Sequence, residues 1–106
     1  MKSVLTEYTK YCSFCGKPTE AEHHLLFGSG VRQLAEEDGI KLPVCNECHN
    51  IGSKLNQIHE NPMAEKLSKM LGQIAWEKAY YKNLLGEVHD PAREAFRKRY
   101  YNRSYL

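Results

Sequence analysis

Four cysteines are the feature that most constrains how this chain can fold. They form two pairs, Cys12-x2-Cys15 and Cys45-x2-Cys48, with 29 residues between the pairs. A two-residue spacing lets neighbouring sulfurs converge on one ion, and two such pairs complete a tetrahedral, all-thiolate zinc site. The alternatives are two disulfides or a redox Cys-x-x-Cys, but the sequence shows neither a secretion signal nor a βαβ pattern. We therefore predict a structural Zn²⁺ at these cysteines, which would add folding free energy to a small core.

Size and composition indicate one small domain. The chain has 106 residues, of which 42% are hydrophobic and 26% charged, and its mean hydropathy is −0.63. These values leave enough apolar side chains for a modest core but no segment long enough to span a bilayer. Residues 1–7 contain no apolar stretch typical of a secretion signal. We expect a cytoplasmic protein with no membrane partner.

Positive charge is concentrated in the C-terminal part of the chain. Residues 1–61 contain six Lys/Arg against eight Asp/Glu, and residues 62–106 contain nine against five, so the formal charges are −2 and +4. A local cluster attracts phosphate even where the net charge is small. A last helix, expected from Pro91 to Arg103, carries a basic surface that is equally compatible with a solvated face and with contact to the DNA backbone. Its basic residues are Arg93, Arg97, Lys98, Arg99 and Arg103.

Three histidines accompany the cysteines. His23 and His24 lie between the two pairs, and His49 directly follows the last cysteine. Adjacent residues of an extended strand point to opposite sides, so His23 and His24 cannot easily bind the same ion. They can divide the work instead, one imidazole holding a divalent cation while its neighbour removes a proton from water.

Hydrophobic periodicity and turn residues predict a small α+β fold. Strands at 22–26 and 40–44 flank a helix at 31–38. Helical spacing of apolar residues predicts a further helix from Asn46, with His49 in its first turns. The expected core is a β-hairpin with a helix packed across it, a ββα arrangement closed at its base by the four-cysteine zinc site. The apolar residues that carry the helical spacing are Ile51, Leu55 and Ile58.

Residues 62–106 are expected to form a helical extension packed on a core of residues 1–61, within one compact domain. Pro62 starts a predicted amphipathic helix whose apolar stripe is expected to pack on the ββα unit. Trp76 extends that surface and is expected in the core rather than stacked on a base. Asp90 is the expected N-cap of the last helix. The stripe consists of Met63, Leu67, Met70, Leu71 and Ile74.

The cysteine pairs and histidines together resemble a known family. Their types and order resemble the zinc-stapled HNH endonucleases of the ββα-metal fold, including small phage and prophage members, over about residues 8 to 60. The resemblance implies a nuclease acting on DNA, with packaging or recombination proteins as partners. It further implies that His23 and His49 bind a catalytic Mg²⁺, Mn²⁺ or other transition metal, and that His24 is the general base. The residues that carry it are Cys12, Cys15, Glu22, His23, His24, Cys45, Cys48 and His49.

The chain departs from the HNH pattern at the middle asparagine. In that family this side chain holds the loop beside the general base, about five residues before the third cysteine. Here the position is occupied by Ile40, with Asp38 just upstream as a substitute that the sequence alone does not establish.

A second departure concerns the last metal ligand. The final motif histidine is replaced by Ser53, and His59 is the nearest candidate for a third ligand. In one unbroken helix over 49–59 the imidazoles of its end residues would lie about 15 Å apart along the axis, too far to share an ion. A break at Gly52 would bring His59 back to the site. Asn50 is a weaker candidate.

Two other functions stay open from the sequence. One is a non-catalytic zinc module that binds nucleic acid, and the other is a zinc-stabilised protein-interaction domain. The nuclease interpretation differs from both because it requires His24 for cleavage.

Overall fold

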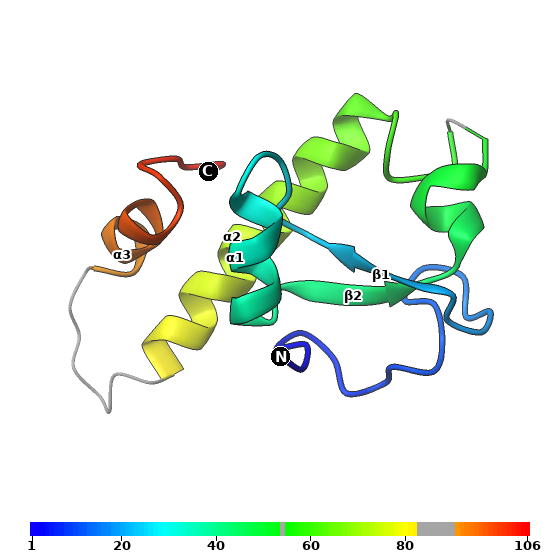
Figure 1. The fold of residues 1–106 in the computed structure, drawn as a ribbon, viewed down its shortest axis with the longest axis horizontal. Helices are drawn as coiled ribbons and strands as arrows, with labels where there is room; N and C mark the ends of the chain where they lie inside the picture. The colour runs from blue at the N-terminus through cyan, green and yellow to red at the C-terminus, as the bar shows by residue number, and fades with distance from the viewer. Residues whose placement is uncertain (54, 83–90) are drawn as a thin grey trace.

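A β-hairpin followed by helices forms the chain, which is the predicted α+β class (Figure 1). The computed structural model describes residues 1–53, 55–82 and 91–106. In Figure 1, the long helix α2 passes behind α1, the short helix that connects the two strands. The elements are β1 (Ala21–His24), α1 (Val31–Asp38), β2 (Lys41–Val44), a single π-helical turn η1 (Glu47–Ile51), α2 (Pro62–Lys82) and α3 (Ala92–Arg99).

The two strands pair antiparallel and place the adjacent histidines on opposite faces. His23 lies opposite Leu42, and His24 lies opposite Lys41. Because side chains alternate along a strand, His23 and Leu42 share one face, while His24 and Lys41 share the other. Both strands were predicted; β1 begins one residue earlier and ends two residues earlier than expected, and β2 begins one residue later.

Helix α1 connects the two strands in sequence, and a glycine in the left-handed conformation lies at each of its ends. Gly30 and Gly39 have φ of 76° and 72°. The Gly39 N–H donates to the carbonyls of Ala35 and Glu36 and so ends the helix as predicted. A Cβ at Gly39 would collide with the carbonyl oxygen of Lys2, because the N-terminal arm packs against this turn.

The helix predicted from Asn46 through Ile58 is much shorter than expected. It ends at Ile51, and Gly52 is extended, with a ψ of −171°. A Cβ at Gly52 would collide with the carbonyl oxygen of Glu47, so a compact turn of this shape favours glycine. Ile51 and Leu55 are 69% and 90% exposed, so their helical spacing does not reflect a buried face.

Beyond this turn the chain folds back on η1 through two backbone hydrogen bonds. The N–H of Ile58 donates to the carbonyl of Cys48 at 2.9 Å, and the N–H of His59 donates to the carbonyl of His49 at 3.0 Å. His59 therefore lies beside His49 rather than a helix length away from it.

Helix α2 packs on the hairpin with a different face from the one predicted. The apolar stripe is exposed, from 73% at Met63 to 37% at Met70. The face that contacts the end of β1 and the residues after it instead carries Ser68 and Gly72, both buried, while the buried Gln73 bonds to Ser104 and Tyr105 near the C-terminus. Gly72 sets this orientation, because a Cβ there would meet side-chain atoms of Leu25 and Leu26 at about 3 Å.

Trp76 lies on the packed face of α2, as predicted, and contacts the main core. The buried residues of that core come from both sequence halves and are Leu25, Leu26, Val31, Ala35, Ile40, Leu42, Phe96 and Tyr100.

Asp38 joins α1 to both C-terminal helices. Its carboxylate accepts hydrogen bonds from Trp76 Nε1 at 3.0 Å, from the Tyr100 hydroxyl at 2.8 Å and from the Arg99 guanidinium at 2.9 Å and 3.1 Å. The idea that Asp38 replaces the HNH asparagine is therefore wrong, since its carboxylate is committed to α2 and α3.

The last helix is also shorter than predicted, and its expected N-cap Asp90 lies outside the described residues.

Within the described part of the chain, no helix combines the length and apolar character needed to cross a bilayer.

Replacing Asp38 with alanine should destabilise the fold. Three donors on two helices lose their acceptor, which we expect to lower the free energy of unfolding by about 2 kcal/mol. Urea denaturation of the two proteins measures this difference. Glu37→Gln is the control, because Glu37 bonds the same Arg99 from an exposed position, and it should change stability by less than about 0.5 kcal/mol. Equal effects of the two substitutions would contradict this role of Asp38.

Candidate metal centres

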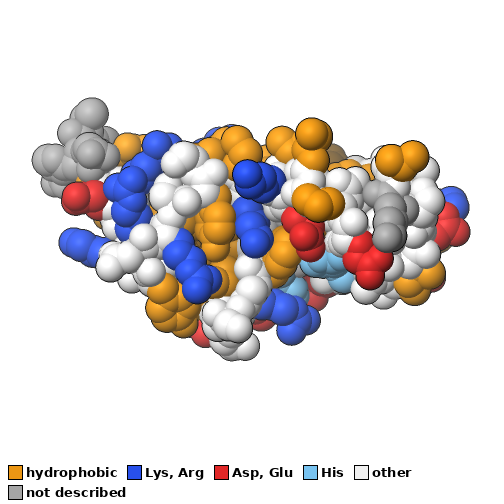
Figure 2. Space-filling model, turned by 90° about the horizontal axis from the view of Figure 1, so that it is seen from above, with side chains coloured by type: hydrophobic (Ala, Val, Ile, Leu, Met, Phe, Trp, Pro, Cys, Tyr) orange, Lys and Arg blue, Asp and Glu red, His pale blue; other side chains and the backbone are white. Residues whose placement is uncertain are grey.

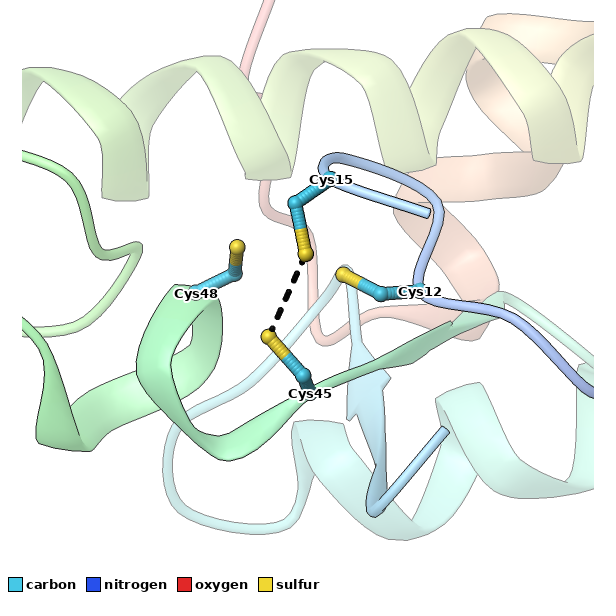
Figure 3. A group of neighbouring side chains, drawn as sticks. All are labelled: Cys12, Cys15, Cys45 and Cys48. Atoms are coloured by element: carbon cyan, nitrogen blue, oxygen red, sulfur yellow. Dashed lines mark hydrogen bonds between the residues drawn. The ribbon is translucent and has the colours of Figure 1, made fainter. Parts of the chain in front are cut away.

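The four cysteine side chains converge on one point, as predicted (Figure 3). Cys12 and Cys15 come from the turn before β1, Cys45 directly follows β2, and Cys48 lies in η1. All four sulfurs lie within 4.8 Å of one another, and those of Cys15 and Cys45 are 3.5 Å apart. Sulfurs around a tetrahedral zinc, with Zn–S of about 2.3 Å, lie about 3.8 Å apart. All four cysteines are free thiols, so the disulfide alternative is not realised.

Local hydrogen bonds favour negative charge on one of these sulfurs. Burial alone would raise the pKa of the Cys12 thiol, but backbone N–H groups of Cys45, Phe14 and Cys15 outweigh it and lower the pKa to about 6. The pKa of Cys48 is raised instead, first by burial and then by the neighbouring sulfurs. A cluster of this kind needs a cation before all of its sulfurs can ionise together.

Three histidines form a second cluster, on the face of the hairpin that packs against α2. His23 comes from β1, His49 from η1, and His59 from the segment that folds back along η1. Their ring centroids are 4.8 to 5.2 Å apart, and one ring nitrogen of each lies within 4.8 Å of the other two. Phe27 packs edge-on against the rings of His23 and His59.

The hydrogen bonds of His23 leave one ring nitrogen without a partner. Ser68 Oγ donates to the carbonyl of Leu25 at 2.9 Å and lies 2.8 Å from His23 Nε2. A hydroxyl has one proton to donate, so Ser68 accepts from Nε2–H, and the lone pair of His23 is on Nδ1. Nδ1 is buried and has no hydrogen-bond partner among the described residues. A buried acceptor left in this way fits a metal ligand, because coordination would satisfy its lone pair.

His59 is oriented in the same manner. Its Nδ1 lies 3.2 Å from Glu65 Oε2, which leaves Nε2 for a cation. Glu65 and Ser68 are three residues apart on α2, so one helix face supports two of the three histidines. The HNH resemblance left the third ligand open, and the structure brings His59 into the cluster.

Burial favours the neutral, metal-binding form of His23 and His49. It lowers the pKa of His23 to about 3, with smaller contributions from the nearby His49, His59 and His24. The pKa of His49 is lowered by burial, then by His59, His24 and Arg32. A set of three imidazole ligands suits a transition metal better than Mg²⁺, which prefers oxygen ligands.

His24 is separate from this cluster and lies on the other face of β1. Its side chain is 7% exposed, and its Nε2 is 2.8 Å from Glu36 Oε1 of α1. Its strand neighbour His23 therefore faces the cluster while His24 faces α1, which is the division expected from alternation. In Figure 2, histidine side chains reach the surface among acidic and basic side chains.

The basic residues predicted for the last helix differ in their surroundings, and Arg103 lies beyond the end of α3 at Arg99. Arg93 pairs with Glu77, and Arg99 is bound to Asp38 and Glu37. The remaining three are exposed, and one of them lies over the ring of Tyr101. They are Arg97, Lys98 and Arg103.

The polar residues that support the histidines are not among the residues predicted for the site. Ser68 and Glu65 were overlooked because the apolar stripe of α2 suggested that another face of the helix was buried. Glu36 was overlooked because its contact with His24 depends on how α1 lies across the hairpin. Helical spacing of Glu65 and Ser68 is the one signal that could have suggested a shared polar face.

Comparisons with family models, with curated proteins and with solved structures found no match for this chain. The class of the protein therefore rests on its architecture. It is a small α+β protein in which a β-hairpin, followed by helices, carries a four-cysteine cluster and a three-histidine cluster. This arrangement is consistent with a ββα-metal-like motif.

Removing one cysteine should abolish metal binding at the four-cysteine cluster and leave the three-histidine cluster unaffected. In Cys15→Ser the cluster loses a ligand, so we expect loss of one bound zinc per chain and a lower Tm. Metal analysis after dialysis and thermal unfolding measure the two effects. His23→Ala, in the other cluster, should keep the cysteine-bound zinc. Retention of that zinc with an unchanged Tm in Cys15→Ser would contradict this assignment.

Removing the Ser68 hydroxyl should weaken metal binding at the three-histidine cluster. Without its acceptor, the His23 ring is no longer held in the tautomer that presents Nδ1, and we expect about 10-fold weaker binding of Mn²⁺, Co²⁺ or Ni²⁺ in Ser68→Ala. Calorimetric titration of protein whose cysteine site already holds zinc measures the affinity. Ser104→Ala, which removes a hydroxyl bonded to Gln73, should leave it unchanged. Equal affinities for all three proteins would show that Ser68 does not support the site.

Proposed function

We propose that the protein is a metal-dependent endonuclease that hydrolyses phosphodiester bonds in DNA. The observation that carries the proposal is the buried Nδ1 of His23, which has no hydrogen-bond partner in the part of the chain that the structure describes and lies in a cluster with His49 and His59. A metal cluster of this kind, directly adjacent in sequence to a further histidine, matches the division of labour that the HNH resemblance implies. The same cysteines and histidines carry that resemblance.

In this proposal the two clusters have different tasks. Zn²⁺ at the four cysteines is structural, because all four positions of a tetrahedral site are taken by protein sulfurs. His23, His49 and His59 would hold the catalytic cation, and their three nitrogens leave positions for water and substrate. When bound, that cation supplies Lewis acidity toward the phosphate and its leaving oxygen.

His24 acts as the general base. It accepts a proton from a water molecule while the water oxygen bonds to phosphorus. The bond from phosphorus to the 3′ oxygen breaks, and its electron pair stays on that oxygen, which takes a proton from solvent. The proton on His24 is then returned to solvent, so the side chain is restored for the next cleavage.

DNA is proposed as the substrate on three grounds. The HNH resemblance implies it, the segment 62–106 carries a formal charge of +4, and cationic side chains of the last helix are exposed. Such groups contact the phosphate backbone and give affinity without base readout. The exposed cations are Arg97, Lys98 and Arg103.

Nicking of supercoiled plasmid in the presence of Mg²⁺, Mn²⁺, Co²⁺ or Ni²⁺ tests the proposal. We expect His24→Ala to reduce the cleavage rate at least about 100-fold, because the proton acceptor is lost, while both metal sites remain filled. Gln33→Ala, an exposed change on α1, is the control and should cleave like the wild type.

Two outcomes would reject the nuclease. One is that the wild-type protein fails to cleave DNA in the presence of any of these four ions. The other is that the His24→Ala variant cleaves at the wild-type rate. Salt-dependent DNA binding without cleavage would instead identify a non-catalytic nucleic-acid-binding module.

A further inference from the structure

The position of the HNH asparagine is apolar in this chain, which raises the question of what holds His24. Ile40 is fully buried in the main core and has no side-chain polar group. Its carbonyl accepts from the N–H of Leu25, which continues the pairing of the strands. The side chain at this position therefore cannot orient the imidazole through a hydrogen bond.

A carboxylate on α1 meets His24 instead. Glu36 Oε1 lies 2.8 Å from His24 Nε2, and Glu36 belongs to α1, which connects the two strands. His24 is 7% exposed, so packing also restricts the ring. Among the described residues, Glu36 is the one carboxylate bonded to the buried imidazole of His24.

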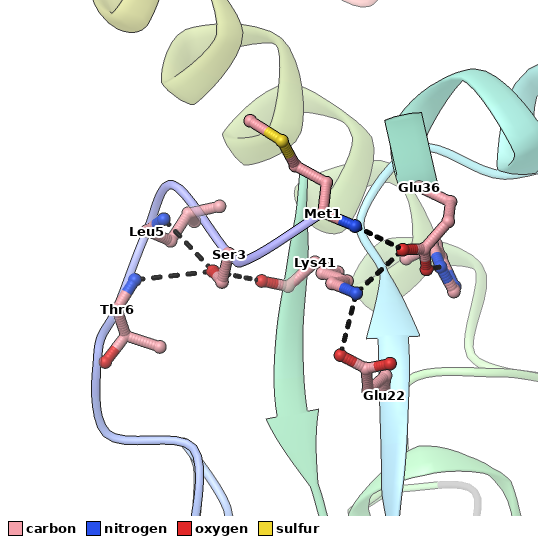
Figure 4. A network of polar contacts seen from close by, with 8 residues as sticks. Met1, Ser3, Leu5, Thr6, Glu22, Glu36 and Lys41 are labelled. Carbon is pink, nitrogen blue, oxygen red and sulfur yellow. Dashed lines mark hydrogen bonds and ion pairs between the residues drawn. The ribbon is translucent and has the colours of Figure 1, made fainter. Parts of the chain in front are cut away.

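Glu36 is itself held in place by a network of charges (Figure 4). Its Oε2 accepts from Lys41 Nζ at 2.8 Å, and the amine of Met1 lies 3.3 Å from the same oxygen. Lys41 also pairs with Glu22 at 3.0 Å, and its side chain is 8% exposed. The two oxygens of Glu36 thus have separate partners, one fixed by the cations and one directed at His24.

This network also defines the ionisation of Glu36. Hydrogen bonds from Lys41, and then from His24, lower the pKa of Glu36 to about 2. At neutral pH the side chain is a carboxylate, which can accept hydrogen bonds but has no proton to donate. The nitrogen of His24 that faces it must therefore carry the proton.

We propose that Glu36 is a positioning residue that fixes His24 in the Nε2–H tautomer and so leaves Nδ1 as the proton acceptor. Its consequence for cleavage rests on the proposed function, whereas its consequence for the tautomer does not. When His24 accepts the proton from water at Nδ1, the ring becomes a cation whose Nε2–H still donates to Glu36. The carboxylate then stabilises the charge that develops on the ring, and it does so without contacting the substrate.

A merely structural ion-pair network would behave differently. If Glu36 served only to join α1 to β2 through Lys41, its removal would change stability but would leave the tautomer of His24 unaffected. The tautomer is therefore the readout that separates a positioning role from a structural one.

The test uses the full chain with Zn²⁺ in both metal sites. Two-dimensional ¹⁵N NMR of the imidazoles, at a pH where the His24 ring is neutral, reports which nitrogen carries the proton. We expect Nε2–H in the wild type and a mixture of both tautomers in Glu36→Gln, which preserves shape and can donate to the ring. Glu37→Gln, one residue along α1 and directed at Arg99, is the control and should match the wild type.

Cleavage kinetics complete the test. We expect Glu36→Gln to lower kcat about 10- to 100-fold with little change in KM, and Glu36→Asp to recover part of the loss. Thermal unfolding of each variant shows whether the chain is folded. The Glu36→Gln substitution removes the charge with almost no change in side-chain volume.

The outcomes separate the two proposals. Nδ1–H in wild-type His24, or a wild-type tautomer in Glu36→Gln, overturns the role of Glu36 whatever the cleavage result. A wild-type protein that never cleaves DNA overturns the proposed nuclease, and the tautomer measurement then decides the role of Glu36 by itself.

Discussion

Convergence of four sulfurs is the interaction on which the rest of the structure depends. The cluster links the turn before β1 to the end of β2 and to the π-helical turn η1. It adds to the backbone hydrogen bonds from Ser13 to Pro43 and from Glu20 to Val44 that also hold these segments together. Few apolar side chains lie in this part of the chain, where the second core cluster contains Cys12, Val44, Cys45 and Ile58 as its buried members. Two of these four buried residues are cysteines, so a cation at the sulfurs would replace the stabilisation that a larger apolar core supplies.

The cysteine cluster also positions the histidine cluster, because the two share a turn. Cys48 and His49 are consecutive residues of η1, and the backbone carbonyls of both accept hydrogen bonds from the returning segment that carries His59. Fixing the sulfur of Cys48 therefore fixes the backbone from which His49 projects and against which His59 lies. The first cluster is a scaffold for the second in this direct geometric sense.

Local features of this fold could be predicted from the sequence, whereas contacts between distant segments could not. The cysteine pairs, the ends of α1 and the opposite directions of His23 and His24 follow from short spacings and backbone geometry. The place of His59 depends on how the chain turns at Gly52 and pairs with η1, which no residue pattern specifies. For α2, hydrophobic spacing indicated the wrong face, because a glycine and small polar residues with specific partners fill the interface instead.

The alternation along β1 has a consequence for how this strand can vary. His23 and His24 share one peptide bond, yet one imidazole belongs to the cluster on the α2 side and the other to the carboxylate on α1. Inserting or deleting a single residue before them would rotate the pair by half a turn and exchange their surroundings. Loops around this strand can change length, but the strand itself must keep the register that places His23 and His24 on their present faces.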